Sequence, residues 1–139
     1  MLAVLAEGAF ALTIRAYVPR AAVGVADSFI NRINLGDVPG AYDLTSRDAG
    51  VGQSLAEFDA RVRRQLAIDA FPLRRSATFV GLRGGGQSYG NRLRRWITGR
   101  KVDPDQVDLD YIFGPPFEIR LTSDAHGNWR VVFFQSHAS

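Results

Sequence analysis

Arginine is the side chain that offers this chain the most chemistry, and it is concentrated in one stretch. Within the 139 residues, positions 70–102 contain eight basic residues and no acidic one, together with Tyr89 and Trp96. Arginine neutralises phosphates and aromatic rings stack on bases, so a nucleic-acid surface is one interpretation. An anionic membrane surface or an acidic protein partner is another. The residues that would form such a surface are Arg74, Arg75, Arg92, Arg95, Arg100 and Lys101.

A purely structural role for these basic residues is a third interpretation. If the chain turns near Pro104, Arg100 lies opposite Asp108 and Asp110 on a neighbouring strand. Such a cross-strand pair stabilises a sheet by roughly 0.2–1 kcal/mol. Lys101 is the only lysine beside sixteen arginines, a bias typical of a GC-rich, bacterial genome. The choice of arginine is therefore weak evidence for phosphate binding, and we favour a structural or partner-docking role over nucleic acid.

Residues suited to catalysis or metal binding are scarce. The chain has no cysteine, which excludes a disulfide, a thiolate zinc site and a cysteine nucleophile. Its two histidines are His126, in an expected turn, and His137, near the C-terminal end. The glycines between positions 81 and 90 lack the Gly-Lys-Ser/Thr ending of a phosphate loop, and we expect a hairpin turn there rather than a capped helix start. We predict no catalytic residue, no metal site and no cofactor.

The elements that would position these residues begin with a β-meander in the last third of the chain. Residues 107–113, 117–122 and 129–134 are runs of alternating apolar and polar residues separated by turn signals. The first run places four apolar side chains on one face: Val107, Leu109, Tyr111 and Phe113. Asp108 and Asp110 then point the other way. The third run is apolar on both faces, which predicts a central strand.

Two further segments precede the meander. Residues 76–83 are expected to form a strand. Residues 92–102 fit either a short helix or a strand, and we prefer the strand because it would pair with residues 107–113 through a turn at Pro104.

The first half of the chain has the signals of three helices. Residues 21–35 have apolar side chains at helical spacing and are followed by Gly36, a typical C-terminal cap. Asp37 is placed to cap a short second helix. Ser54 and Glu57 form a capping box that opens a third. Its expected inward residues are Leu55, Phe58, Val62 and Leu66.

Residues 1–20 are apolar apart from Glu7, Arg15 and Arg20. One interpretation is a buried or partner-docked helix, and the other is a membrane anchor or interfacial segment. The residues expected to dock to the membrane or the partner are Leu2, Val4, Leu5, Phe10, Leu12 and Ile14. We divide the chain into this docking segment, 1–20, and one folded domain, 21–139.

The order of helices and strands resembles the cone-shaped domains of the nuclear-transport-factor-two-like (cystatin-like) superfamily. The resemblance depends on five segments: ADSFI at 26–30, LGD at 35–37, AYDLTS at 41–46, SLAEF at 54–58 and GNWRVVFF at 127–134. It implies an α+β fold with three N-terminal helices packed on a curled four-stranded antiparallel sheet. The superfamily includes isomerases, dehydratases, small-ligand binders and adaptor domains, and its enzymes use an Asp–His or Asp–Tyr pair inside the cone.

An incompletely filled cone would form a pocket for a small apolar or carboxylated ligand. The candidate pocket residues are Tyr89, Arg94, Trp96, Tyr111 and Phe113. An inward-facing acid beside a tyrosine or histidine would favour such a function, and a cone plugged by Phe and Trp side chains would oppose it.

The function expected from the sequence is a non-catalytic interaction module. We expect an accessory or assembly subunit, membrane-associated without an assigned side, that docks through residues 1–20 to a membrane, to a membrane-protein complex or to a second copy of itself. The alternative is a small-molecule binder or a lyase- or isomerase-type enzyme that uses the cone pocket.

Overall fold

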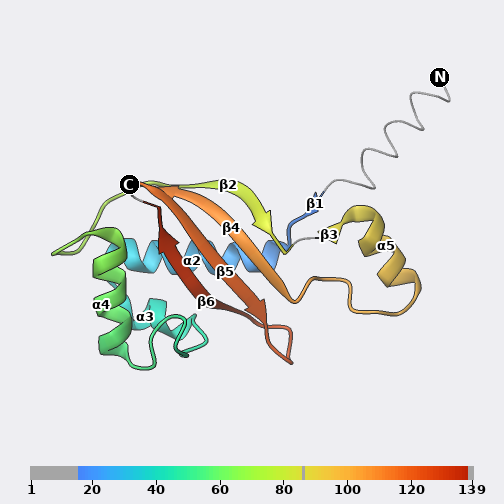
Figure 1. Ribbon diagram of the computed structural model, residues 1–139, viewed down its shortest axis with the longest axis horizontal. Helices are drawn as coiled ribbons and strands as arrows, with labels where there is room; N and C mark the ends of the chain where they lie inside the picture. Colours follow the sequence, from blue (N-terminus) through green and yellow to red (C-terminus); the bar gives the residue numbers. More distant parts are fainter. Residues whose placement is uncertain (1–15, 86, 138–139) are drawn as a thin grey trace, which may run out of the picture.

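The computed structural model describes residues 16–85 and 87–137, and these form an α+β fold (Figure 1). The predicted docking residues between Leu2 and Ile14 lie outside the described residues. The three predicted N-terminal helices are α2 (Arg20–Leu35), α3 (Val38–Asp43) and α4 (Leu55–Leu66). The main sheet consists of β2 (Ala77–Gly84), β4 (Gln106–Phe113), β5 (Pro116–Ser123) and β6 (Trp129–Ser136), antiparallel and in the spatial order β2-β4-β5-β6. The predicted fold class is confirmed.

The helix ends lie where the local sequence signals place them. Gly36 ends α2 with a φ of 86°, a conformation that costs glycine little. A Cβ at this position would also lie 2.8 Å from the Cβ of Phe71. The side chain of Asp37 accepts a hydrogen bond from the backbone N–H of Gly40 (3.0 Å) and so caps α3. Side-chain caps of this kind satisfy backbone donors that have no partner within the helix.

The capping box of α4 forms with one difference from the expected pattern. Ser54 accepts a hydrogen bond from the N–H of Glu57 (3.2 Å), as predicted. The carboxylate of Glu57 in turn accepts from the N–H of Gln53 (2.9 Å), one residue before the cap. Phe58, Val62 and Leu66 are buried, but the prediction that Leu55 points inward was wrong. It is the first residue of the helix and remains 41% exposed.

The two faces of β4 are occupied as predicted. The four apolar residues of the strand are buried against the helices: Val107, Leu109, Tyr111 and Phe113. On the other face Asp108 pairs with Arg120 (2.8 Å) and Asp110 pairs with Arg83 (2.7 Å). Both arginines belong to strands that neighbour β4. The predicted pairing of these acids with Arg100 was therefore wrong, although the kind of interaction was right.

Segment 92–102 is not a strand, and that prediction was wrong. Its first part belongs to a helix, α5 (Tyr89–Ile97), and β2 takes the place beside β4 that the segment was expected to fill. A short stretch of apolar and basic residues fits both periodicities. Residues 77–84 form an eight-residue strand that pairs with β4, so this edge of β4 is not open to segment 92–102.

Strand β6 lies at the edge of the sheet, so the prediction of a central strand was also wrong. Two features explain its apolar composition. A bulge at Val132 turns Phe134 inward, where it is buried, and leaves Phe133 on the outer face beneath the Arg120 guanidinium. In addition, the N–H of Ser46 donates to the carbonyl of Val131 (2.9 Å), so the segment before α4 covers the outer edge of the strand.

Aromatic side chains fill the space between the helices and one half of the sheet. The ring of Phe134 lies 5.5 Å from that of Phe29, 5.8 Å from that of Phe58 and 6.1 Å from that of Phe117. Helix α2, which runs behind the sheet in Figure 1, packs on β6 and β5. The β2 side is less covered, since the first four residues of that strand are exposed.

Candidate functional site

The described residues form two candidate sites, and the first is an arm at one end of the molecule. Strand β1 (Ala16–Tyr17) pairs with β3 (Gln87–Ser88), and α5 follows β3 directly. We call residues 16–17 and 87–105 the arm. Helix α5 packs on β1 and β3 and projects beyond the main sheet (Figure 1).

The start of α5 is capped by Ser88, whose side chain accepts a hydrogen bond from the N–H of Asn91 (3.1 Å). The prediction that no capped helix start follows the glycine run was therefore wrong. This serine, three residues before Asn91, is the sequence signal that could have identified the helix.

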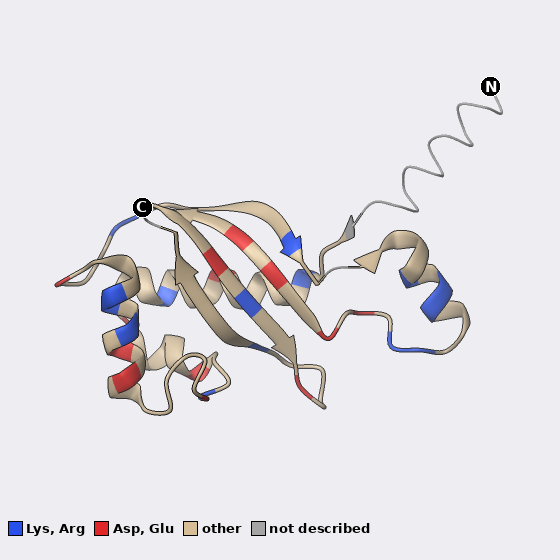
Figure 2. Cartoon of the chain, viewed as in Figure 1, with Lys and Arg blue, Asp and Glu red and all other residues tan. Residues whose placement is uncertain are grey.

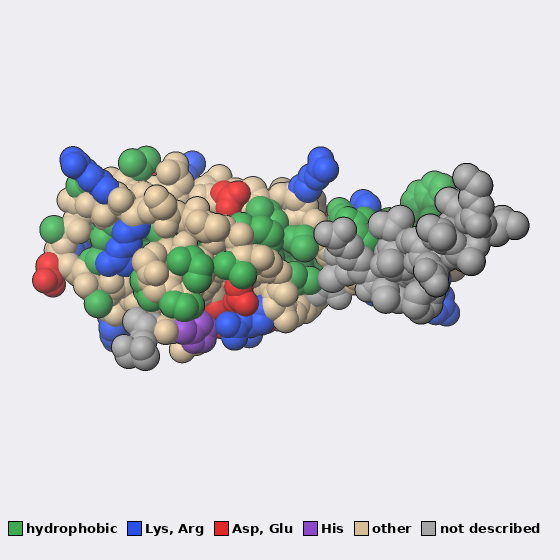
Figure 3. Space-filling view, turned by 90° about the horizontal axis from the view of Figure 1, so that it is seen from above, with side chains coloured by type: hydrophobic (Ala, Val, Ile, Leu, Met, Phe, Trp, Pro, Cys, Tyr) green, Lys and Arg blue, Asp and Glu red, His purple; other side chains and the backbone are tan. Residues whose placement is uncertain are grey.

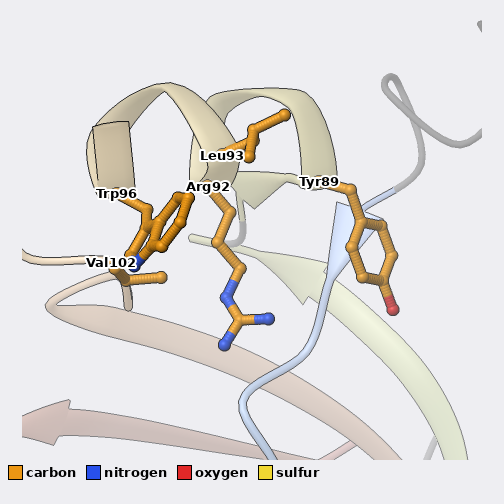
Figure 4. Close-up of a pocket in the computed structure, with 5 residues that line it drawn as sticks. All are labelled: Tyr89, Arg92, Leu93, Trp96 and Val102. Carbon is orange, nitrogen blue, oxygen red and sulfur yellow. The ribbon is translucent and has the colours of Figure 1, made fainter. Parts of the chain in front are cut away.

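An open groove of about 440 Å³ runs along α5. It is lined by Tyr89, Arg92, Leu93, Trp96 and Val102. Tyr89, Arg92 and Trp96 project from the same side of the helix, and Val102 lies close to the Trp96 ring (Figure 4). The guanidinium of Arg92 stacks over the ring of Tyr17 at 4.0 Å, and the rings of Tyr17 and Tyr89 meet edge to face at 5.6 Å. These aromatic contacts attach α5 to β1.

Two charged groups, Arg92 and Asp103, lie close to Tyr17. Burial raises the pKa of Tyr17, and the negative charge of Asp103 raises it further, while Arg92 acts in the opposite direction. Within the described part of the chain, the buried Nε of Arg92 and the buried Oδ1 of Asp103 have no hydrogen-bond partner. The arm thus combines exposed apolar surface with polar groups that are incompletely satisfied.

The basic residues predicted to form one surface lie in two places. Arg92, Arg95, Arg100 and Lys101 belong to the arm, as Figure 2 shows by the blue segments of α5 and of the loop that follows it. Lys101 pairs with Asp105 (2.8 Å), and Arg95 donates to the carbonyl of Lys101 (3.2 Å). Arg74 and Arg75 lie elsewhere, in the connection between α4 and β2.

The five predicted pocket residues also do not share one cavity. Tyr89 and Trp96 line the groove of the arm, whereas Arg94 contributes to a separate depression of about 240 Å³. Tyr111 and Phe113 are buried on β4, facing the helices. The predicted cone pocket with arginine at its mouth does not form from these residues.

The second candidate site is a groove of about 380 Å³ between α2 and the start of β2. It is lined by Asp27, Ile30, Asn31, Asn34, Arg75, Ala77 and Phe79. Beneath it the hydroxyl of Tyr111 donates a hydrogen bond to Oδ1 of Asp27 (2.7 Å), and the rings of Phe79 and Tyr111 lie 5.4 Å apart. Burial raises the pKa of Tyr111 far above its ordinary value, and Asp27 adds to this shift. The phenol therefore stays neutral and acts as a donor.

Arg75 is held firmly at the side of this groove. The amide of Asn34 donates to the carbonyl of Arg75 (2.9 Å) and accepts from its N–H (2.8 Å). The buried Nη1 of Arg75 has no hydrogen-bond partner among residues 16–85 and 87–137. Arg75 and Phe79 both line the groove, so a small carboxylated ligand there would meet a cationic side chain and an apolar wall.

Asp27, Asn31 and Asn34 were not among the site residues predicted from the sequence. They occupy positions i, i+4 and i+7 of α2 and so form a polar stripe beside its apolar one. That spacing was visible in the sequence. Its significance was not, because it depends on Tyr111, which is 84 residues away from Asp27 in the chain.

The outer face of the sheet carries charges of both signs. Glu118 is 3.2 Å from His137 and 4.0 Å from Arg83, which extends the two Asp–Arg pairs described above. In Figure 3, which views the molecule from above, histidine, basic and acidic side chains lie beside one another toward the lower border. Such mixed pairing is typical of a solvated sheet face rather than of a binding site for a polyanion.

In the portion of the chain that is described, no three His, Asp or Glu side chains are grouped closely enough to hold a metal ion. None of the described helices has the length and apolar composition needed to cross a membrane.

Comparisons with known protein families, with curated proteins and with solved structures give no match to this chain.

Proposed function

We propose that this chain is a non-catalytic interaction module of the nuclear-transport-factor-two-like kind, an accessory or assembly subunit that docks to a membrane or a membrane-protein complex. Docking would use the apolar N-terminal segment and the arm. The observation that carries this proposal is the pairing of β1 with β3, because it brings the end of the apolar stretch, Ala16–Tyr17, next to α5.

The exposed apolar surface of the arm supports the proposal. None of the residues of α5 is buried. Leu93 is 53% exposed, Trp96 69% and Ile97 70%. Large apolar side chains that gather on an exposed surface mark sites of interaction with another protein or a membrane, and tryptophan is enriched among the residues that dominate such contacts.

The packing of the core also supports a non-catalytic role. The space beneath β5 and β6 is filled by the rings of Phe29, Phe58, Phe117 and Phe134. The filled space leaves no room for a substrate beneath β5 and β6.

The test is fractionation of the native protein from its own cells, followed by size analysis in mild detergent. The full chain is expected to migrate with membranes in a large complex, and a variant with Trp96→Ser and Ile97→Ser is expected to be released as a small folded domain. Val80→Ser, which changes a 62% exposed apolar residue on β2, is the matched control and should stay bound. A full chain that is soluble and small would contradict the proposal.

A second candidate function is favoured by one specific observation, the Asp27–Tyr111 pair at the groove between α2 and β2. Asp27 is exposed rather than directed into a cone, and its carboxylate accepts a hydrogen bond from a tyrosine beside a groove that a small ligand can enter. The groove would hold a compact ligand that presents a carboxylate to Arg75 and a hydrogen-bond donor to Asp27. Its volume, about 380 Å³, is in the range of small-molecule sites.

This second function can be tested by thermal unfolding in the presence of small zwitterions such as amino acids and dipeptides. Binding would raise the unfolding temperature of the native chain, since a ligand stabilises the state that binds it. Asp27→Asn and Arg75→Gln would each remove that rise, while Arg64→Gln on α4 would retain it. A panel of zwitterions that leaves the native unfolding temperature unchanged would argue against the groove as a ligand site.

A further inference from the structure

We propose that α5 is an interfacial helix that lies on an anionic lipid bilayer, with Trp96 and its apolar neighbours inserted among the headgroups and the exposed Arg94 and Arg100 bound to lipid phosphates. This inference rests on the proposed docking function and names the surface to which the arm docks.

The spacing of residues around α5 matches that of an interfacial helix. At about 100° per residue, Tyr89, Leu93, Trp96 and Ile97 fall within an arc of roughly one quarter to one third of the circumference. Arg94 borders this arc on one side and is exposed, whereas Arg92, on the other side, stacks its guanidinium on Tyr17. Long basic side chains at the border of an apolar face can extend to the headgroups while the apolar residues enter the membrane.

The exposures follow the same division. The residues of the apolar arc are the ones a soluble domain would be expected to cover, yet Tyr89 is 43% exposed and Trp96 and Ile97 are each about 70% exposed. The remaining face of α5 carries Asn91 and Arg95. Tryptophan and tyrosine are the residues enriched at the membrane–water interface, because their rings are apolar and their N–H or O–H groups remain hydrated.

The net positive charge of the arm favours binding to anionic rather than neutral lipids. Between residues 87 and 105 there are five basic residues and two acids, Asp103 and Asp105. Asp105 is paired with Lys101, and Asp103 lies beside Tyr17 under Arg92. Arg94 and Arg100 are exposed and have no acidic partner within the described ranges. The excess of positive charge complements the phosphates of anionic lipids.

The position of the arm in the fold is consistent with this surface. The apolar stretch of the sequence ends where β1 begins, and β1 is hydrogen-bonded to the strand that leads into α5. A membrane that received the apolar segment would therefore also be within reach of α5. The apolar segment and α5 would bind the membrane together. One weak anchor alone binds reversibly, and a second basic or apolar element strengthens the attachment.

The experiment uses the full chain with vesicles of phosphatidylcholine alone or with one third phosphatidylglycerol. Trp96 reports directly, because the only other tryptophan, Trp129, is 6% exposed. With anionic vesicles we expect a blue shift of the tryptophan emission and quenching by lipids brominated near the headgroup. Trp96→Phe keeps an apolar side chain at this position and should abolish both signals without releasing the protein from the vesicles.

The charge contribution is measured separately. Arg94→Gln should weaken binding to the anionic vesicles about fivefold, the effect expected for one basic residue near the surface, and should leave binding to neutral vesicles unchanged. Arg64→Gln, an exposed arginine on α4, is the matched control and should change affinity less than twofold.

Three outcomes would overturn the inference. If the vesicle-bound chain keeps Trp96 accessible to iodide, the arm faces away from lipid, and docking through residues 1–20 still stands. If the chain does not bind vesicles but, in extracts of its own cells, migrates with a membrane-protein complex, α5 binds a protein surface. If it does neither, the proposed docking function fails together with this inference.

Discussion

At the scale of single residues, the contact with the most consequence is the hydrogen bond between Tyr111 and Asp27. It joins β4 to α2 at 2.7 Å, beside the contact in which the Phe79 and Tyr111 rings lie 5.4 Å apart. Hydrogen bonds to charged groups contribute about 1.5–3 kcal/mol when shielded and less when water reaches the acceptor, as it does at the exposed Asp27.

Tyr111→Phe is expected to lower the free energy of unfolding by about 1–2 kcal/mol, because it removes this donor and leaves the rest of the ring in place. The measurement is urea unfolding of Tyr111→Phe, Asp27→Ala and the double variant. A coupling of about 1 kcal/mol between the two sites is expected for residues in direct contact. Effects that add within a few tenths of a kcal/mol would show that the pair does not interact in solution.

The same tyrosine predicts a dependence of stability on alkaline pH. Burial, with the added effect of Asp27, raises the pKa of Tyr111 in the folded chain, whereas the unfolded chain ionises near pH 10. The neutral phenol is thus favoured by folding, and stability is fully present below about pH 10 and is lost as the pH rises further. Chemical unfolding between pH 8 and 11 measures this. The native chain should lose more stability over that range than Tyr111→Phe, and equal losses would contradict the assignment.

At the scale of elements, the sequence predicted what is decided locally. The capping residues Asp37 and Ser54, the stop at Gly36 and the alternation of β4 each depend on neighbours within a few residues. The errors came from competition between distant segments. Residues 92–97 do not form the expected strand, since β2 pairs with β4 at that position. The place of β6 depends on a bulge at Val132 and on the backbone near Ser46.

The two serine caps provide a test of how independently the elements are stabilised. Ser54→Ala should lower the free energy of global unfolding by about 1 kcal/mol, because α4 packs Phe58, Val62 and Leu66 into the core. Ser88→Ala removes an equivalent bond at α5, which buries none of its residues, and should leave the global value unchanged.

Amide hydrogen exchange gives the complementary measurement, since local opening is visible there even when global stability is constant. Ser88→Ala should speed exchange in residues 92–97 and leave α4 unaffected. A loss of global stability equal to that of Ser54→Ala would mean that α5 folds as part of the core.

At the scale of the whole molecule, the fold divides into a core and an arm. The core holds α2, α3, α4 and the main sheet around one cluster of buried apolar residues, and none of the residues of that cluster belongs to α5. The sequence predicted this core. It could not predict the site, because the pocket candidates Trp96 and Tyr111 are separated by the division into core and arm.

Replacing residues 86–105 by a short glycine-containing turn should leave the core folded. Gly84 and Asp108 are paired across β2 and β4, so a hairpin connection can join the strands at this point. We expect cooperative urea unfolding with a free energy within about 1 kcal/mol of the native value, since the buried cluster is intact. A variant without a cooperative transition would show that the arm is part of the folding unit.

The bulges in β2 have a consequence for aggregation. An outer strand with a regular row of free backbone donors and acceptors is a template on which a second copy can grow into a fibril. The ladder of β2 is interrupted between Phe79 and Gly81 and again between Leu82 and Gly84, so the row is broken twice within eight residues. At the opposite edge of the sheet, the backbone N–H and carbonyl of Val131 in β6 are hydrogen-bonded to Leu44 and Ser46. The fold therefore keeps both outer strands from recruiting further copies, even though β2 leaves Val80 and Phe79 in contact with water.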